Sequence, residues 1–111
     1  MSKKIVIDIQ SPYYLHPSEG PGVVITSVIF NRKNYKLWQQ EVRIALKSKN
    51  KLGFIDETLK RLDLKEGDDQ TELNAWEMAN SMICSWIISV IDSKLHPSIA
   101  YIETAAGMWD N

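Results

Sequence analysis

The sequence QTELNAWEMANSMICSWIISVID, residues 70–92, predicts the central element of this fold. Apolar side chains recur on one face at helical spacing, namely Leu73, Trp76, Ile83, Ile87, Val90 and Ile91. Others spread apolar character around the cylinder, namely Met78, Met82, Trp86 and Ile88. A helix that is apolar nearly all round must be buried by several neighbours, so we expect a multi-helix fold.

Two polar features accompany this predicted helix. Asp69 and Glu72 stand three residues apart at its start and imitate a capping box, in which the acidic side chains also suit the positive helix end. Ser81, Ser85 and Ser89 recur every four residues and leave a narrow strip of small side chains. That strip could let another helix approach closely, but a solvated strip is the favoured interpretation.

A second helix is predicted from Asn34, the expected N-cap, to a stop near residues 50–53. Its apolar face consists of Tyr35, Trp38, Val42, Ala45 and Leu46. A basic stripe is expected on another face, made of Arg32, Lys36, Arg43 and Lys47. This element is therefore an amphipathic helix with a cationic outer surface.

The remaining segments are less regular. Residues 54–67 predict a connector with one short helical turn at most. Pro97 suits the first turn of a new helix through Ile99 and Tyr101, and Thr104 is the expected N-cap of a last helix over residues 105–109. Gly107 should weaken that last helix by about 1 kcal/mol relative to Ala. Because this helix reaches only about two turns before Asn111, we expect the chain to be truncated there.

The first 30 residues predict an extended arm, because Pro and Gly recur through them. The β-branched run over residues 23–30 is either a short strand or part of an arm packed on the helices. We therefore expect a mainly α protein of about four helices. Its predicted organisation is an N-terminal arm over residues 1–30 and a helical domain over residues 31–111.

Composition argues against several functional classes. The single cysteine, Cys84, lies in the apolar helix without an evident partner, and His16 and His96 each precede a proline. No catalytic, cofactor-binding or metal-binding pattern is recognisable, so we expect no enzyme activity, cofactor, metal or small-molecule substrate. The longest apolar run is too short to cross a bilayer, and no secretory signal is recognisable, so a cytoplasmic protein is expected.

Charge is unevenly distributed although the net charge is only −1. Residues 32–51 contain seven basic side chains and one acid, Glu41, whereas residues 56–77 contain eight acids and three basic side chains. The two segments are therefore candidates for a contact between copies of the chain. The four tryptophans (Trp38, Trp76, Trp86 and Trp109) could stack nucleobases, but core packing is the favoured interpretation.

An ordered set of short motifs resembles the N-terminal Gag region of plant copia-type LTR retrotransposons. The stretches that carry the resemblance are 11–19 with Pro21-Gly22, Asn34-Tyr35 with Trp38, 49–54, Trp76, Ser85-Trp86, and 101–106 with Trp109. Two positions depart from the family pattern. Asn31-Arg32-Lys33 replaces a usual Gly before the Asn-Tyr pair, and Gly107 replaces a usual charged residue after the Ala-Ala pair.

The resemblance implies a helical, capsid-like unit that self-associates into a virus-like particle shell around element RNA. Arg32, Lys36, Arg43 and Lys47 are then the predicted assembly or RNA contacts. Two alternatives stay open: an RNA-binding module that uses the basic helix face, and a truncated remnant without function. A small hydrolase has no support in the spacing of the His, Asp and Ser residues.

Overall fold

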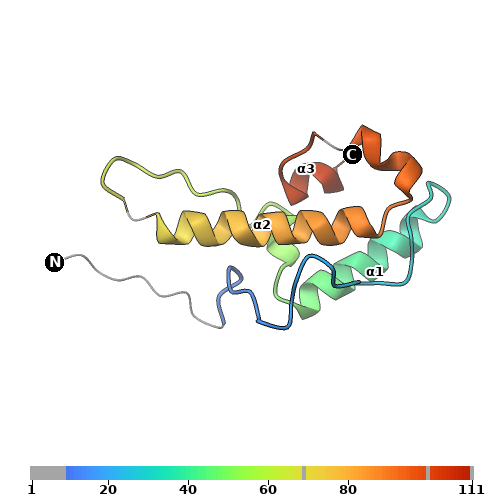
Figure 1. The fold of residues 1–111 in the computed structure, drawn as a ribbon, viewed down its shortest axis with the longest axis horizontal. Helices are drawn as coiled ribbons and strands as arrows, with labels where there is room; N and C mark the ends of the chain where they lie inside the picture. The colour runs from blue at the N-terminus through green and yellow to red at the C-terminus, as the bar shows by residue number, and fades with distance from the viewer. Residues whose placement is uncertain (1–9, 69, 100, 111) are drawn as a thin grey trace.

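The structure is a computed structural model that describes residues 10–68, 70–99 and 101–110. Within these residues the chain is mainly helical, which confirms the predicted fold class. The elements in chain order are α1 (Tyr35–Ser48), the 3₁₀ helix η1 (Leu52–Phe54), α2 (Thr71–Ser89), the 3₁₀ helix η2 (Ser93–Ser98) and α3 (Ala105–Trp109). Figure 1 shows α2 along the middle of the molecule, with α1 and α3 on different flanks.

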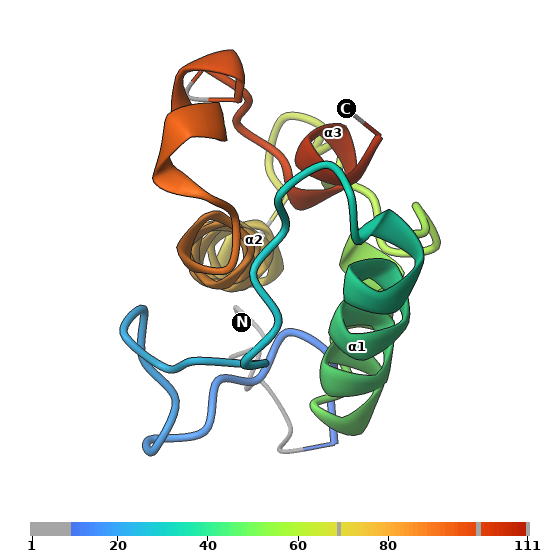
Figure 2. The ribbon, with the colours of Figure 1, turned by 90° about the vertical axis from the view of Figure 1, so that its right-hand side faces the viewer.

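The long helix α2 is buried from several sides, as its apolar coat predicts. Figure 2 looks nearly along α2 and shows α1 on one side, α3 on another and the blue N-terminal arm below. The largest side chains that are fully buried come from α1, α2 and the residue after α2: Val42, Leu46, Ile83, Trp86, Ile87 and Val90. The core therefore centres on α1 and α2, and η1 and α3 add buried side chains to it, namely Phe54, Ala105 and Met108.

The end of α2 differs from the prediction of a helix to Asp92, because α2 ends at Ser89. Phe30 and Ile91 form an isolated parallel bridge. The Phe30 N–H donates to the Val90 carbonyl at 2.8 Å, and the Asp92 N–H donates to the Phe30 carbonyl at 2.9 Å. These bonds join Phe30 to the residues that follow α2. Apart from this bridge, residues 23–30 are irregular, so they form an arm segment packed on the helices rather than a strand.

The helix α1 starts where it was predicted to start, but the Asn34 side chain does not cap it as expected. Asn34 is the N-cap residue, yet its side chain makes no capping hydrogen bond. Its Oδ1 accepts from the Asn31 N–H at 3.1 Å, and its Nδ2 donates to the Ile29 carbonyl at 2.8 Å. The Asn34 amide therefore closes the preceding turn instead of capping the helix.

The start of α2 has Gln70 as its N-cap residue, without a side-chain capping bond, and Glu72 in its first turn. The predicted partner of Glu72, Asp69, lies outside the described residues.

Ser81 and Ser89 are exposed on α2, which supports the interpretation of the serine positions as a solvated strip. The short helical turn predicted within residues 54–67 lies earlier, because η1 (Leu52–Phe54) overlaps that range only at Phe54.

The C-terminal elements confirm one cap and correct one helix start. Thr104 caps α3, since its Oγ1 accepts from the Gly107 N–H at 3.0 Å. The helix predicted to begin at Pro97 is wrong, because Pro97 lies near the end of η2, which begins after the Asp92 cap. The glycine in α3 also has a packing reason: a Cβ at Gly107 would lie 2.8 Å from Ile102 Cγ2 and 2.9 Å from Thr104 Oγ1.

Candidate functional site

The predicted contact residues all lie on the surface. Arg32 is exposed in the turn before α1, and Lys36, Arg43 and Lys47 are exposed on α1 itself. At about 100° per residue, the three lysine and arginine side chains of α1 share one stripe, whereas Trp38, Val42 and Leu46 form its buried face. The structure thus places these four cations where a partner could reach them.

Two apolar residues that were not predicted as contacts are exposed beside the basic stripe of α1. Leu37 is 56% exposed and Ile44 is 55% exposed. They are seven positions apart, and at helical spacing they lie beside the stripe of Lys36, Arg43 and Lys47. The signal that could have found them is an apolar pair recurring on a polar helix face. We call these five residues the outer face of α1.

Not every basic residue of the cationic segment is available to a partner. Lys49 pairs with Glu19, with 3.1 Å between Nζ and Oε1, and its Nζ lies 5.2 Å from the centre of the Trp86 ring. Lys51 is only 2% exposed, and its Nζ donates to the Tyr14 carbonyl at 2.7 Å. Lys49 and Lys51 therefore add to the charge of residues 32–51 but not to the basic surface, because each is engaged by contacts with the arm.

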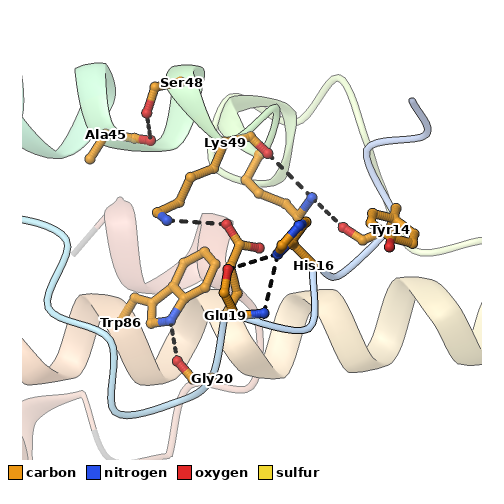
Figure 3. A network of polar contacts seen from close by, with 10 residues as sticks. Tyr14, His16, Glu19, Gly20, Ala45, Ser48, Lys49 and Trp86 are labelled. Carbon is orange, nitrogen blue, oxygen red and sulfur yellow. Dashed lines mark hydrogen bonds and ion pairs between the residues drawn. The ribbon is translucent and has the colours of Figure 1, made fainter. Parts of the chain in front are cut away.

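These inward contacts fasten the N-terminal arm, as Figure 3 shows. The Trp86 Nε1 donates to the Gly20 carbonyl at 2.8 Å. His16 stabilises the local turn, since its Nδ1 lies 2.7 Å from Ser18 Oγ. We define the arm clasp as Tyr14, Glu19, Gly20, Lys49, Lys51 and Trp86. It brings together three of the stretches that carry the Gag resemblance, which are distant in sequence.

Burial lowers the pKa of Lys51, because desolvation disfavours its charged form. The nearby Glu19 carboxylate acts in the opposite direction and Lys49 adds to the lowering. The hydrogen bond to Tyr14 keeps the ammonium group paired despite its burial. Lys51 is therefore a fastening residue of the arm rather than a contact for an external anion.

The acidic segment presents most of its charge to solvent. The exposed acids of residues 56–77 are Asp56, Glu57, Asp63, Glu66, Asp68, Glu72 and Glu77. Glu77 pairs with Arg61 at 2.9 Å, and Asp56 accepts from the backbone and side chain of Thr58, which lowers the pKa of that carboxyl. Figure 1 shows the loop before α2 projecting from the end of the molecule, away from α1.

The tryptophans are largely core residues, in agreement with the interpretation that favoured core packing over base stacking. Trp38, Trp76 and Trp86 are at most 5% exposed. Their ring N–H groups donate to the carbonyls of Val90, Leu59 and Gly20 respectively, so burial leaves no unpaired donor on these rings. Trp109 differs, because it is only partly buried and stacks on Trp38 with 5.3 Å between ring centres.

Cys84 and His96, which were weighed as reactive or metal-binding residues, contact the protein interior or its backbone. Cys84 is buried, and burial raises the pKa of its thiol to about 11. His96 contacts the Ile91 carbonyl at 2.9 Å. Over residues 10–68, 70–99 and 101–110, no three His, Cys, Asp or Glu side chains gather into a group that could hold a metal ion. Nor does a helix in these ranges combine the length and apolar character needed to cross a membrane.

Comparison with protein families gives a match over part of the chain. Residues 16–61 match the family model of the Gag-polypeptide of LTR copia-type. A search of curated proteins and a search of solved structures each gave no significant match. The matched range contains the arm from His16 onward, α1 and η1, so it includes most of the arm clasp and the whole outer face of α1.

Proposed function

Residues 16–61 are a copia-type Gag region, and from this premise we propose that the chain is a non-enzymatic, self-associating module of a Gag-like retrotransposon protein. Its task in this proposal is to build a capsid or virus-like particle shell in the cytoplasm of a plant cell. The partner is another copy of the same chain. The proposal requires no cofactor, membrane or small-molecule substrate.

One observation carries the proposal: the outer face of α1 combines exposed cations with exposed apolar side chains. Lys36, Arg43 and Lys47 supply the charge, and Leu37 and Ile44 supply apolar surface. Burying an exposed aliphatic side chain stabilises a contact by about 1.5–3 kcal/mol, whereas exposed ion pairs contribute roughly 0–1 kcal/mol each. Apolar burial would therefore supply most of the affinity, and charge would select the partner surface.

The complementary surface is the acidic loop before α2. Asp63, Glu66 and Asp68 are exposed there, and Glu72 follows in the first turn of α2. Hydrogen bonds from Thr58 lower the pKa of Asp56, and Arg43 of the same copy adds a smaller lowering, so Asp56 belongs to the intramolecular charge balance. The farther acids are the better candidates for an intermolecular contact, because the loop projects away from α1 (Figure 1).

A contact between two different surfaces is heterologous, so each copy can bind one neighbour at α1 and another at the acidic loop. Such head-to-tail contacts propagate into rings or open filaments, depending on the rotation between neighbours. A shell needs this kind of propagation, whereas a contact between two identical patches would stop at a dimer. The separation of the two charged surfaces along the molecule thus supports assembly.

Sedimentation velocity over a series of protein and salt concentrations tests the proposal. We expect oligomers that grow with protein concentration and dissociate as salt increases, because exposed charge pairs are screened within about 10 Å at 0.1 M salt. The variant Arg43→Glu should shift the protein towards monomer, and so should Leu37→Ser. The matched control is Lys94→Glu, which makes the same type of charge change on the exposed surface of η2.

Mixing variants sharpens the test. A protein with Arg43→Glu and Lys47→Glu should associate with a protein carrying Glu66→Lys and Glu72→Lys, because the reversed charges are again complementary. Neither variant should form long chains alone, because its α1 face and its loop before α2 then carry charge of the same sign. A wild-type protein that stays monomeric at every concentration and salt would contradict the assembly proposal.

A further inference from the structure

An aromatic pocket lies beside the start of α1, on surface that the proposed assembly contact does not use. Its volume is about 310 Å³. The rings of Phe30, Tyr35, Trp38 and Trp109 line it, together with Arg32 and aliphatic side chains from η2 and the end of α2. The ring centres are close: 6.0 Å for Phe30 and Tyr35, 5.0 Å for Phe30 and Trp38, and 5.3 Å for Trp38 and Trp109.

Three of these rings reach solvent to some degree, including Phe30, which is partly buried. Tyr35 is 46% exposed, and Trp109 is partly buried, whereas Trp38 is 4% exposed and forms the floor of the ring cluster. Aromatic side chains that are half exposed and flank a pocket can stack on a planar ligand without a change in the fold. The pocket therefore has the chemistry of a stacking site.

The backbone at Arg32 is strained. Its φ is +74°, in the left-handed region, where a side chain is disfavoured by roughly 1–2 kcal/mol. Glycine adopts this conformation freely, so an arginine at this position is not explained by the turn alone. Strained residues gather at ligand sites, and this one places a guanidinium among the pocket-lining residues.

Arg32 is the charged side chain that lines the pocket, and no acidic residue is among the lining residues. Its sequence neighbour Lys33 is also exposed. Two acids follow lining residues in sequence. Asp92 is the cap of η2 and accepts from the Lys94 N–H at 3.1 Å, whereas Asp110 is exposed after Trp109. The charge balance favours an anionic ligand at the side of Arg32.

We infer that this pocket binds an unpaired nucleotide of single-stranded RNA, with the base stacked on Tyr35 and Trp109 and a phosphate held by Arg32. Unpaired bases offer a flat ring to aromatic side chains, and a guanidinium binds phosphate oxygens with two parallel hydrogen bonds. The base in a duplex is already stacked on its neighbours, so paired RNA should not enter. This inference is independent of self-association.

Fluorescence anisotropy of a labelled ten-nucleotide RNA tests the inference, at a protein concentration where sedimentation shows one species. Tyr35→Ala should weaken binding by roughly fivefold to a hundredfold, because that is the usual contribution of one stacked base. Tyr35→Phe should retain most of the affinity, since the ring is kept. The matched control is Tyr101→Ala, because Tyr101 is 94% exposed and is not among the pocket-lining residues.

Arg32→Gly is the second informative variant. It should weaken binding while the stability of the fold is kept or increased, since glycine relieves the strained turn. It should also reduce the dependence of log affinity on log salt by about one phosphate contact, whereas Tyr35→Ala should leave that slope unchanged. Arg43→Ala and Lys47→Ala, farther along α1, should change affinity much less than Arg32→Gly.

Three results would overturn the inference. The first is an equal loss of affinity in Arg32→Gly and Arg43→Ala, which would indicate general attraction to positive charge. The second is binding of a duplex as tight as that of the single strand. The third is binding of a free mononucleotide as tight as that of the ten-nucleotide RNA, which would assign the pocket to a small nucleotide instead. Absence of RNA binding at tens of micromolar protein in low salt would also overturn it.

Discussion

The indole Nε1 of Trp86 donates a 2.8 Å hydrogen bond to the carbonyl oxygen of Gly20, across 66 positions of the sequence. Trp86 is fully buried in the last turn of α2, whereas Gly20 lies in the arm. Lys49 lies over the same indole ring and pairs with Glu19, the neighbour of Gly20. One tryptophan therefore joins the arm to both long helices (Figure 3).

Trp86→Phe should release the arm. The substitution removes the donor to Gly20 and part of a fully buried side chain, so we expect the free energy of unfolding to fall by about 2–3 kcal/mol. Urea denaturation measures this loss. Chymotrypsin should also cleave the arm faster at Tyr13 and Tyr14. The control is Trp76→Phe, whose lost hydrogen bond goes to Leu59 instead, so it should leave arm cleavage unchanged.

The ion pair between Glu19 and Lys49 should be stronger than the surface pair between Arg61 and Glu77. Glu19 and Lys49 have side chains that are 15% and 23% exposed, whereas those of Arg61 and Glu77 are 59% and 47% exposed. A double-mutant cycle with Glu19→Gln and Lys49→Met should give a coupling of about 0.5–1 kcal/mol. The same cycle at the surface pair should give roughly 0.2–0.5 kcal/mol. Equal couplings would contradict the role of burial.

Arg32→Gly should stabilise the protein. Relief of the left-handed strain should exceed the entropy that glycine adds to the unfolded chain, for a net gain of about 0.5–1 kcal/mol. Lys33→Gly is the matched control, because Lys33 is the neighbouring exposed cation and is not among the residues with positive φ. It should lower the free energy of unfolding by a similar amount. A loss of stability in Arg32→Gly would show that the side chain, and not the strain, dominates.

Cys84 should react slowly with thiol reagents while the protein is folded. Burial raises the pKa of its thiol to about 11, whereas an unfolded cysteine has a pKa near 8.5, so at pH 8 the folded thiolate fraction is roughly a hundredfold smaller. The rate of reaction with an aromatic disulfide reagent, with and without urea, measures this difference. Rapid labelling of the folded protein would contradict the buried, inert thiol.

The same thiol predicts a dependence of stability on pH. Between about pH 8.5 and pH 11 the unfolded chain releases the Cys84 proton first, so the free energy of unfolding should fall as pH rises. Lys51 acts in the opposite direction, because its lowered pKa makes the unfolded chain bind more protons at high pH. Comparison of the wild type with Cys84→Ala isolates the effect of the thiol.

The sequence by itself determined the elements that depend on local spacing. The apolar faces of α1 and α2, the Thr104 cap and the exposure of Arg32, Lys36, Arg43 and Lys47 follow from helical periodicity and from the chemistry of single side chains. A buried helix with an apolar coat also implied its neighbours before they were seen. Several motifs resemble copia-type Gag, and the family match over residues 16–61 agrees with that resemblance.

Only the tertiary structure decided the features that depend on partners distant in sequence. Phe30 bonds through its backbone to Val90 and Asp92, directly after the end of α2. The side-chain amide of Asn34 donates to the carbonyl of Ile29. Lys49 and Lys51 contact the arm instead of solvent, because Lys49 pairs with Glu19 and Lys51 donates to the Tyr14 carbonyl. Helical periodicity indicates which face of a helix is apolar. It does not indicate which distant backbone group will bond to a polar side chain, because that contact forms only when the arm packs on the helices.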